Sequence, residues 1–247
     1  MTLLTRTLLT AAVITSMSTL ATPSFDTLTI RATELDAPKL ATSTEVTIDP
    51  TTGTRIDSQF YQSSVRGWEF NYSEQFSDRM YWSLGYQNDR ATFAENSQMF
   101  QSSPLAVASY TQQTHLRTRR YTLGAGYIMP LSDNTTVDIS GNIGRMKWKE
   151  SESNRYDFAD GYAESSSQQN RYRTVAGYQA RLRHEFGEDL EFYATLGSER
   201  WYADEDETIT VQKFGLNYFI FDETAISVEF GRYDDEDRSA IGIHFTY

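Results

Sequence analysis

Five charged residues in the second half of the chain have the types and spacing of an ion-pair network: Arg181, Arg183, Glu191, Glu199 and Glu229. The two arginines stand two residues apart, so on a β-strand they share one face. The three glutamates lie on the polar face of later segments that alternate in the same way. Charges taken out of water must pair or become neutral. We expect these side chains to pair inside the protein and fill it; the alternative is a narrow polar pore.

The residue types give little support for a catalytic function. The histidines are His115, His184 and His244, and cysteine is absent, which excludes thiol catalysis and a disulfide framework. The sequence around His115 has neither the paired aspartates nor the Asp–His pair of a rim protease, nor the His–Ser pair of a lipid-modifying enzyme. A catalytic triad is defined by geometry rather than by spacing, so distant partners stay open. We predict a protein that is not an enzyme, with no catalytic residue, cofactor or metal site.

The charged residues belong to segments with the two-residue period of β-strands. Leu190, Phe192, Ala194 and Leu196 alternate with polar residues, and the same pattern recurs from Ile56 onward. Small residues beside long charged ones suit a narrow lumen in which side chains occupy the space that glycine leaves. Nine of the 14 glycines stand on the face opposite the apolar one: Gly85, Gly124, Gly126, Gly144, Gly177, Gly197, Gly215, Gly231 and Gly242.

This alternation predicts an all-β fold, an antiparallel transmembrane β-barrel. We count nine strands from Ile56 onward and one before it, in residues 26–31 or 44–49. Short turns near residues 76, 132, 188 and 222 alternate with longer connections, above all residues 88–115 and 150–171. Tight periplasmic turns and longer extracellular loops are typical of outer-membrane barrels. If both termini are periplasmic the strand number is even, which gives ten strands, or eight if two segments are loop extensions.

Composition is consistent with a barrel and excludes other classes. The mean hydropathy of the 247 residues is -0.55, and no run of 18 apolar residues follows the N-terminal region, which excludes a helical membrane protein. A net charge of -12 makes nucleic-acid binding improbable. A secreted β-sandwich or lipocalin-like barrel would also alternate, but with its apolar side inward and its charged side outward.

The N-terminal region has the pattern of a secretory signal. Arg6 precedes a run of apolar and small residues that ends at Ala21, where we expect cleavage. We therefore divide the chain into a signal peptide (1–21), an N-terminal segment that contains the first strand (22–54) and the barrel (55–247).

Residues 240–247 form the last alternating segment. Gly242, Phe245 and Tyr247 match the order polar–x–Gly–x–x–aromatic–x–aromatic, while Ala240 stands where a polar residue is usual. This resembles the C-terminal assembly signal of bacterial outer-membrane β-barrels, and the whole pattern is similar to the OmpA membrane domain and OmpX-type small barrels. The resemblance implies a Gram-negative cell outer membrane and insertion by the barrel assembly machinery.

These observations favour an outer-membrane barrel with a side-chain-filled lumen and a structural or surface-interaction role through its extracellular loops. The alternative is a narrow porin for small solutes, and after it a protease or lipid-modifying enzyme at the rim. The partners that we expect are outer-membrane lipid and lipopolysaccharide, with the assembly machinery during biogenesis. We expect a monomer and no nucleic acid.

Overall fold

The computed structural model describes residues 24–36, 43–48, 55–62, 65–100, 107–158, 161–202, 206–234 and 236–247. The predicted signal peptide lies outside these residues. Within the described ranges no helix has the length and hydropathy to cross a membrane. The strands are β1 (Thr27–Asp36), β2 (Ser43–Ile48), β3 (Arg55–Gln62), β4 (Val65–Ser77), β5 (Met80–Phe100), β6 (Val107–Ser132), β7 (Thr135–Phe158), β8 (Gly161–Phe186), β9 (Leu190–Tyr202), β10 (Glu207–Phe221), β11 (Thr224–Tyr233) and β12 (Glu236–Thr246).

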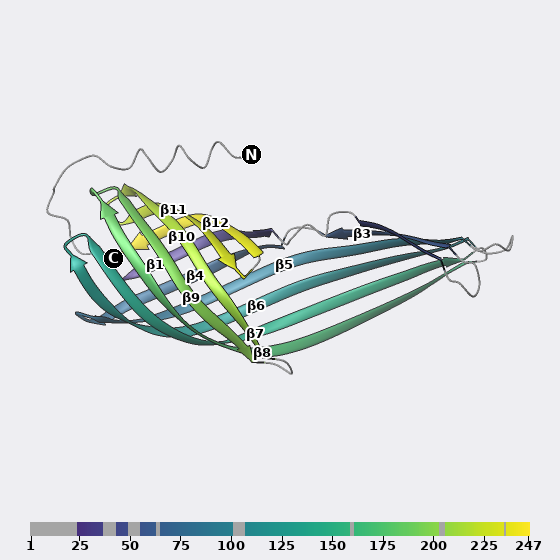
Figure 1. Ribbon diagram of the computed structural model, residues 1–247, viewed down its shortest axis with the longest axis horizontal. Coiled ribbons are helices and arrows are strands. Elements are labelled where there is room, and N and C mark those ends of the chain that lie inside the picture. The colour runs from purple at the N-terminus through teal and green to yellow at the C-terminus, as the bar shows by residue number, and fades with distance from the viewer. Residues whose placement is uncertain are drawn as a thin grey trace.

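Ten of these strands close into an antiparallel barrel, which confirms the predicted fold class and strand number. The ring runs β1, β4, β5, β6 and onward in chain order to β12, which pairs again with β1. The two remaining strands extend the sheet outside the ring, because β3 pairs with β5 and β2 pairs with β3. Figure 1 shows the barrel and the sheet that projects from one end of it.

The first barrel strand is β1, so the undecided segment of the sequence is residues 26–31 rather than 44–49. Thr27 lies opposite Thr246 on one side and Ser73 on the other, which places β1 between the last strand and β4. Residues 43–48 form β2, outside the ring. The long apolar series that starts at Ile56 is divided between β3 and β4.

The polar segments predicted as loops are strands in the structure, which corrects that expectation. Strands β5 to β8 are 21 to 26 residues long and continue past the barrel as two paired hairpins. Residues 88–100, 107–115, 150–158 and 161–171 belong to these extensions. The period was hidden because polar Ser, Thr, Gln and Asn stand on both faces, whereas the apolar alternation requires lipid on one side.

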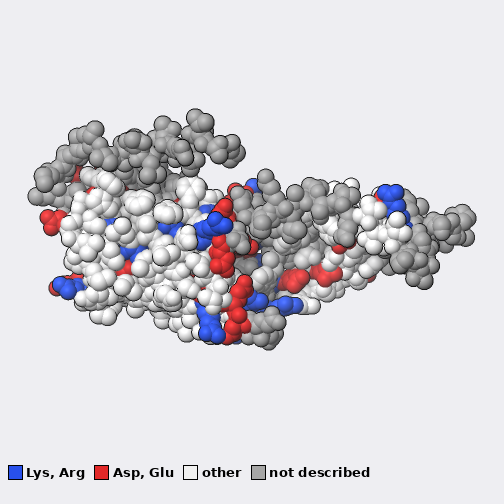
Figure 2. Space-filling view, in the orientation of Figure 1, with Lys and Arg blue, Asp and Glu red and all other residues white. Residues whose placement is uncertain are grey.

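The apolar residues of the barrel face outward. On β12 the outward side chains of Ile241 and Ile243 are 59% and 48% exposed, while the inward Ala240 and His244 are each 5% exposed. A soluble barrel would have the opposite arrangement. Figure 2 shows a largely uncharged barrel surface, with charged side chains gathered at the end from which the sheet projects.

The other end of the barrel carries four tight connections, between Ser77 and Met80, Ser132 and Thr135, Phe186 and Leu190, and Phe221 and Thr224. We call this the short-turn end, and the opposite one the projecting end. Gly187 in the third turn has a φ of 72°, a left-handed conformation that glycine adopts without steric cost. The alternation of short and long connections is therefore that of the predicted topology.

Candidate functional site

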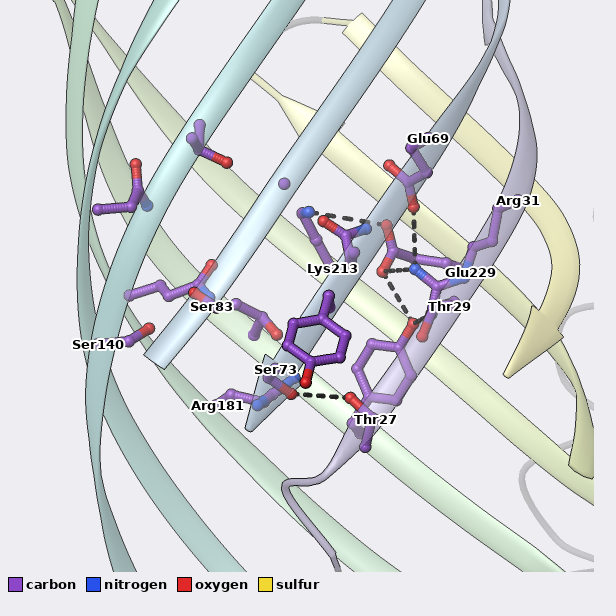
Figure 3. Close-up of a pocket in the computed structure, with 18 of the residues that line it drawn as sticks. Thr27, Thr29, Arg31, Glu69, Ser73, Ser83, Ser140, Arg181, Lys213 and Glu229 are labelled. Carbon is purple, nitrogen blue, oxygen red and sulfur yellow. Dashed lines mark hydrogen bonds and ion pairs between the residues drawn. The ribbon is translucent and has the colours of Figure 1, made fainter. Parts of the chain in front are cut away.

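The centre of the lumen holds a network of buried charges (Figure 3). Arg31 on β1 donates from Nη1 to Oε1 of Glu69 and to Oε2 of Glu229, each at 3.0 Å. The second oxygen of Glu69 accepts from Arg238 at 2.6 Å, and Lys213 Nζ lies 3.7 Å from the other oxygen of Glu229. Each carboxylate thus pairs with two cations, which compensates the loss of solvation of all five groups.

Tyr193 joins this network from the opposite wall. Its hydroxyl accepts a hydrogen bond from Arg31 Nη2 at 2.7 Å and donates to Glu229 at 2.8 Å. The tyrosine ring needs the space at Gly215 on β10, because a Cβ there would overlap the ring. A glycine beside a long side chain is the arrangement that the alternation predicted. The network consequently crosses the lumen from β1 to β9.

A second layer of charges lies toward the short-turn end. Arg183 pairs with Glu191, whose other oxygen accepts from Asn217 at 2.7 Å. Arg181 pairs with Asp138 at 2.8 Å, since the two residues stand directly opposite on β8 and β7. The second oxygen of Asp138 accepts from the Tyr81 hydroxyl at 2.5 Å.

Phe25 closes the lumen at this end. It precedes β1, lies outside any strand and is 1% exposed. Its ring centroid is 4.9 Å from that of Tyr81, and the guanidinium carbons of Arg183 and Arg181 lie 4.7 and 5.6 Å from it. Arg183 also donates to the carbonyl oxygen of Ser24 at 2.7 Å, which fixes the backbone that carries the phenyl ring.

A third layer closes the lumen toward the projecting end. Arg120 on β6 makes two hydrogen bonds to Glu199 on β9, of 2.8 and 2.7 Å. Beyond this pair the Arg173 guanidinium lies over the rings of Trp148 and Trp201, at 5.4 and 5.9 Å. Four apolar inward side chains at this level are buried: Met146, Val175, Ile209 and Val211.

Between these layers lies a polar cavity of about 210 Å³. Its wall includes Ser83 on β5, Ser140 and Asn142 on β7, and Gln179 on β8, together with members of the charged layers. Oδ1 of Asn142 is buried and has no hydrogen-bond partner among the described residues, which leaves an acceptor on the cavity wall for a polar guest such as water.

His244 also lines the cavity and is buried. Its Nδ1 lies 2.7 Å from the Thr29 hydroxyl, and its Nε2 has no partner in the described part of the chain. The other histidines lie apart: His184 Nδ1 is 2.7 Å from the Thr135 hydroxyl, and His115 Nδ1 is 3.2 Å from that of Thr92.

The structure places all five residues of the predicted network on the lumen side but brings together only Arg183 and Glu191. Arg181 pairs with Asp138 instead, Glu199 with Arg120, and Glu229 with Arg31 and Lys213. The alternation also places Glu69 and Asp138 on the lumen face, although the predicted network did not include them. Sequence reasoning missed the plug and the cations of the network: Phe25, Arg31, Arg120, Lys213 and Arg238. Arg31 and Glu69 face each other in the β1–β4 register, so strand pairing would have indicated them.

The residues of the predicted assembly signal lie on β12 and directly after it. Gly242 stands on the face of the lumen-lining Ala240 and His244, and Tyr247 is 57% exposed. The backbone nitrogen of Tyr247 donates to the Asp26 carbonyl at 3.1 Å, which ties the last residue to the start of β1. Recognition of Gly242, Phe245 and Tyr247 by an assembly machinery stays a prediction.

No known protein family and no curated protein matches the chain. Among solved structures it is similar to the translocator domain of the autotransporter NalP from Neisseria meningitidis, with 8% identity, a TM-score of 0.47 and coverage of 91% of this chain and 90% of that one. The Escherichia coli outer-membrane protease OmpT shares 11% identity over 90% and 94% of the chains, with a TM-score of 0.45.

The KdgM porin shares 10% identity over 90% of this chain and 99% of its own, with a TM-score of 0.40. These proteins include a translocator, a protease and a porin, so the similarity assigns no activity. The class of protein is defined here by the chain's own strand pairing and its outward apolar face: a ten-stranded membrane β-barrel.

Proposed function

We propose that the chain is a structural and surface-interaction barrel of the bacterial outer membrane. Its lumen is filled by side chains, and its projecting sheet extends outside the cell. The single observation that carries the proposal is the ion pairing of the lumen at three levels, from Arg183–Glu191 through Arg31–Glu69 to Arg120–Glu199. A barrel of this strand number has little interior space, and these pairs cross it on both sides of the central cavity.

The projecting sheet supplies the surface for interaction. Residues 161–173 of β8 pair only with β7, because the pairing of β8 with β9 begins at Thr174. This free edge is largely polar, and every residue from Gly161 to Tyr172 is exposed. An exposed strand edge offers unpaired backbone donors and acceptors to another chain. The sheet is therefore suited to contacts outside the membrane.

Removal of the distal β7–β8 hairpin tests the surface role. Deletion of residues 151–168 with insertion of an Asn-Gly turn keeps Glu150 opposite Gln169, the last pair of the shortened hairpin. We expect cells that display the full chain to aggregate and attach to surfaces more than cells without it, and cells that display the shortened barrel to lose this gain. Equal behaviour of cells with the two chains, at equal surface amounts, would contradict the surface role.

The cavity of about 210 Å³ favours the narrow porin as a second candidate function. The discriminating assay is swelling of liposomes that contain the purified barrel, in isotonic solutions of a pentose or of glycine. The proposed function predicts that liposomes with the barrel swell no faster than liposomes without protein. A porin would make them swell faster, and more so with the smaller solute.

A further inference from the structure

The outward face of β5, β6 and β7 carries a group of cations where the apolar band of the barrel ends. We call it the cationic stripe. It comprises Arg90 on β5, Arg117 and Arg119 on β6, and Arg145, Lys147 and Lys149 on β7. Each of these residues lies an even number of residues from an exposed apolar residue of its own strand: Leu84 on β5, Leu123 on β6 or Ile143 on β7. The cations and these apolar residues therefore share one face of the sheet. The stripe therefore continues the lipid-facing surface toward the projecting end.

The strand register places like charges directly opposite one another. Arg117 lies between Arg90 and Lys149, and Arg119 lies opposite Lys147. Directly opposed side chains have Cβ atoms about 5 Å apart, and like charges in such pairs destabilise a sheet. Three adjacent like-charge pairs in a chain of net charge -12 indicate a compensating anion.

The described residues supply no such anion. None of the six cations forms an ion pair with a described carboxylate. On the projecting parts of β5 to β8, Asp89, Glu95, Glu150 and Glu152 stand on the opposite sheet face, while Asp157 and Glu164 share the face of the stripe but pair with Arg155. Nε of Arg119 is buried without a hydrogen-bond partner in the described ranges. Nε of Arg117 donates to Oδ1 of Asn88 at 2.8 Å, so the stripe has one unmet donor in addition to its uncompensated charge.

Aromatic rings mark the depth at which the stripe lies. Trp68, Tyr86 and Tyr121 form a chain of ring contacts with centroid distances of 4.8 and 4.9 Å. On the neighbouring strand β8, the ring of Tyr172 lies under Arg145 and Lys147, at 4.8 and 5.5 Å. Aromatic belts of membrane proteins sit at the level of the lipid headgroups. Cations directly beyond such a belt are placed to meet headgroup phosphates.

We propose that the cationic stripe binds the phosphate groups of an anionic lipid in the adjacent leaflet. Arginine and lysine bind phosphate through charge-assisted hydrogen bonds, and the register rows present these donors side by side. The acyl chains of the same lipid cover the apolar band of the barrel next to the stripe. One lipid molecule thus contacts both the cationic stripe and the apolar band. This inference depends on the barrel lying in a membrane and not on the partners of the projecting sheet.

The test uses the purified, folded full chain in neutral detergent. Lipid A with two phosphates and the same lipid without phosphates are titrated separately, and bound lipid is measured by native mass spectrometry. The variant is Arg119→Gln, Lys147→Gln, Lys149→Gln. At about 1 kcal/mol for each cation, its affinity for the phosphorylated lipid falls on the order of 100-fold. Lipid without phosphates binds both proteins equally weakly.

Arg155→Gln is the matched control, because Arg155 lies farther along the same face of β7 and already pairs with Asp157 and Glu164. This variant keeps the affinity of the unmodified chain. A gel shift on boiling verifies that each variant is folded. Unchanged binding by the triple variant would overturn the proposal, as would equal affinity for the lipid without phosphates. Displacement of the lipid by millimolar inorganic phosphate would instead assign the stripe to a free anion.

Discussion

Glu69 and Glu229 determine whether the charges of the lumen are tolerated. Each forms ion pairs with two cations, and their side chains are 6% exposed. A buried ion network adds little to stability when complete, but removal of one member leaves a charge without compensation. Single substitutions in the network are therefore expected to lower stability, even though backbone hydrogen bonds between the strands close the barrel.

Glu69→Gln leaves Arg31 and Arg238 short of one negative charge. We expect a loss of about 3 kcal/mol in the free energy of unfolding, measured by denaturant titration of the folded barrel in detergent. Glu34→Gln is the control, since Glu34 makes an exposed ion pair with Arg66, for which about 0–1 kcal/mol is typical. Equal unfolding midpoints for the two variants would refute the buried network.

Phe25→Ala removes the ring that closes the short-turn end. Deletion of a buried phenyl group costs about 3–5 kcal/mol, so the temperature at which the band shifts on a gel should fall markedly. Phe76→Ala removes the same atoms from a side chain that is 58% exposed near a short turn, and should have a much smaller effect. A Phe25 variant as stable as the Phe76 variant would show that Phe25 is not a packed plug.

At the scale of elements, β12 closes the barrel between β11 and β1. Phe245→Lys places a charge on the outward face of this strand and removes an aromatic residue of the predicted assembly signal. We expect the amount of folded chain in the outer membrane to fall severalfold, as measured by membrane fractionation. Phe245→Tyr, which keeps an aromatic ring, should assemble normally. Normal assembly of the lysine variant would contradict both roles.

The barrel strands could be predicted from the sequence, whereas the projecting hairpins could not. Apolar alternation arises where one strand face meets lipid, as with Ile241 and Ile243. Beyond the membrane both faces of β5 to β8 meet water, so polar residues on both faces hide the strand period. The sequence also could not decide between the two candidate first strands. The first strand of the ring is the one that pairs with β12, and local pattern does not reveal such a long-range contact.

The predicted site was recovered in part for a related reason. Alternation identified which charges face inward, but it did not identify their partners. Arg120 and Glu199 meet across the lumen from β6 and β9, and Arg31 reaches Tyr193 in the same way. These contacts depend on the closed cross-section of the barrel. Phe25 had no strand pattern at all, because it precedes β1.

At the scale of the whole molecule, we expect the barrel to fold without the distal β7–β8 part of the projecting sheet. In the shortened chain that lacks residues 151–168, all pairs between residues 135–149 and 170–184 remain. We therefore expect this chain to keep the gel shift on boiling, with an unfolding midpoint close to that of the full chain. Loss of the shift would show that the projecting sheet is needed for barrel folding.

The central claim is that three layers of paired charges and the Phe25 plug close the lumen to solutes. It is tested most directly by recording current across planar lipid bilayers that contain the purified full chain in 1 M KCl. The account predicts a baseline without stable unitary steps at moderate voltage, with membrane insertion verified by protease protection of the reconstituted barrel. Reproducible unitary conductance steps, carried by the same folded chain, would contradict a closed lumen.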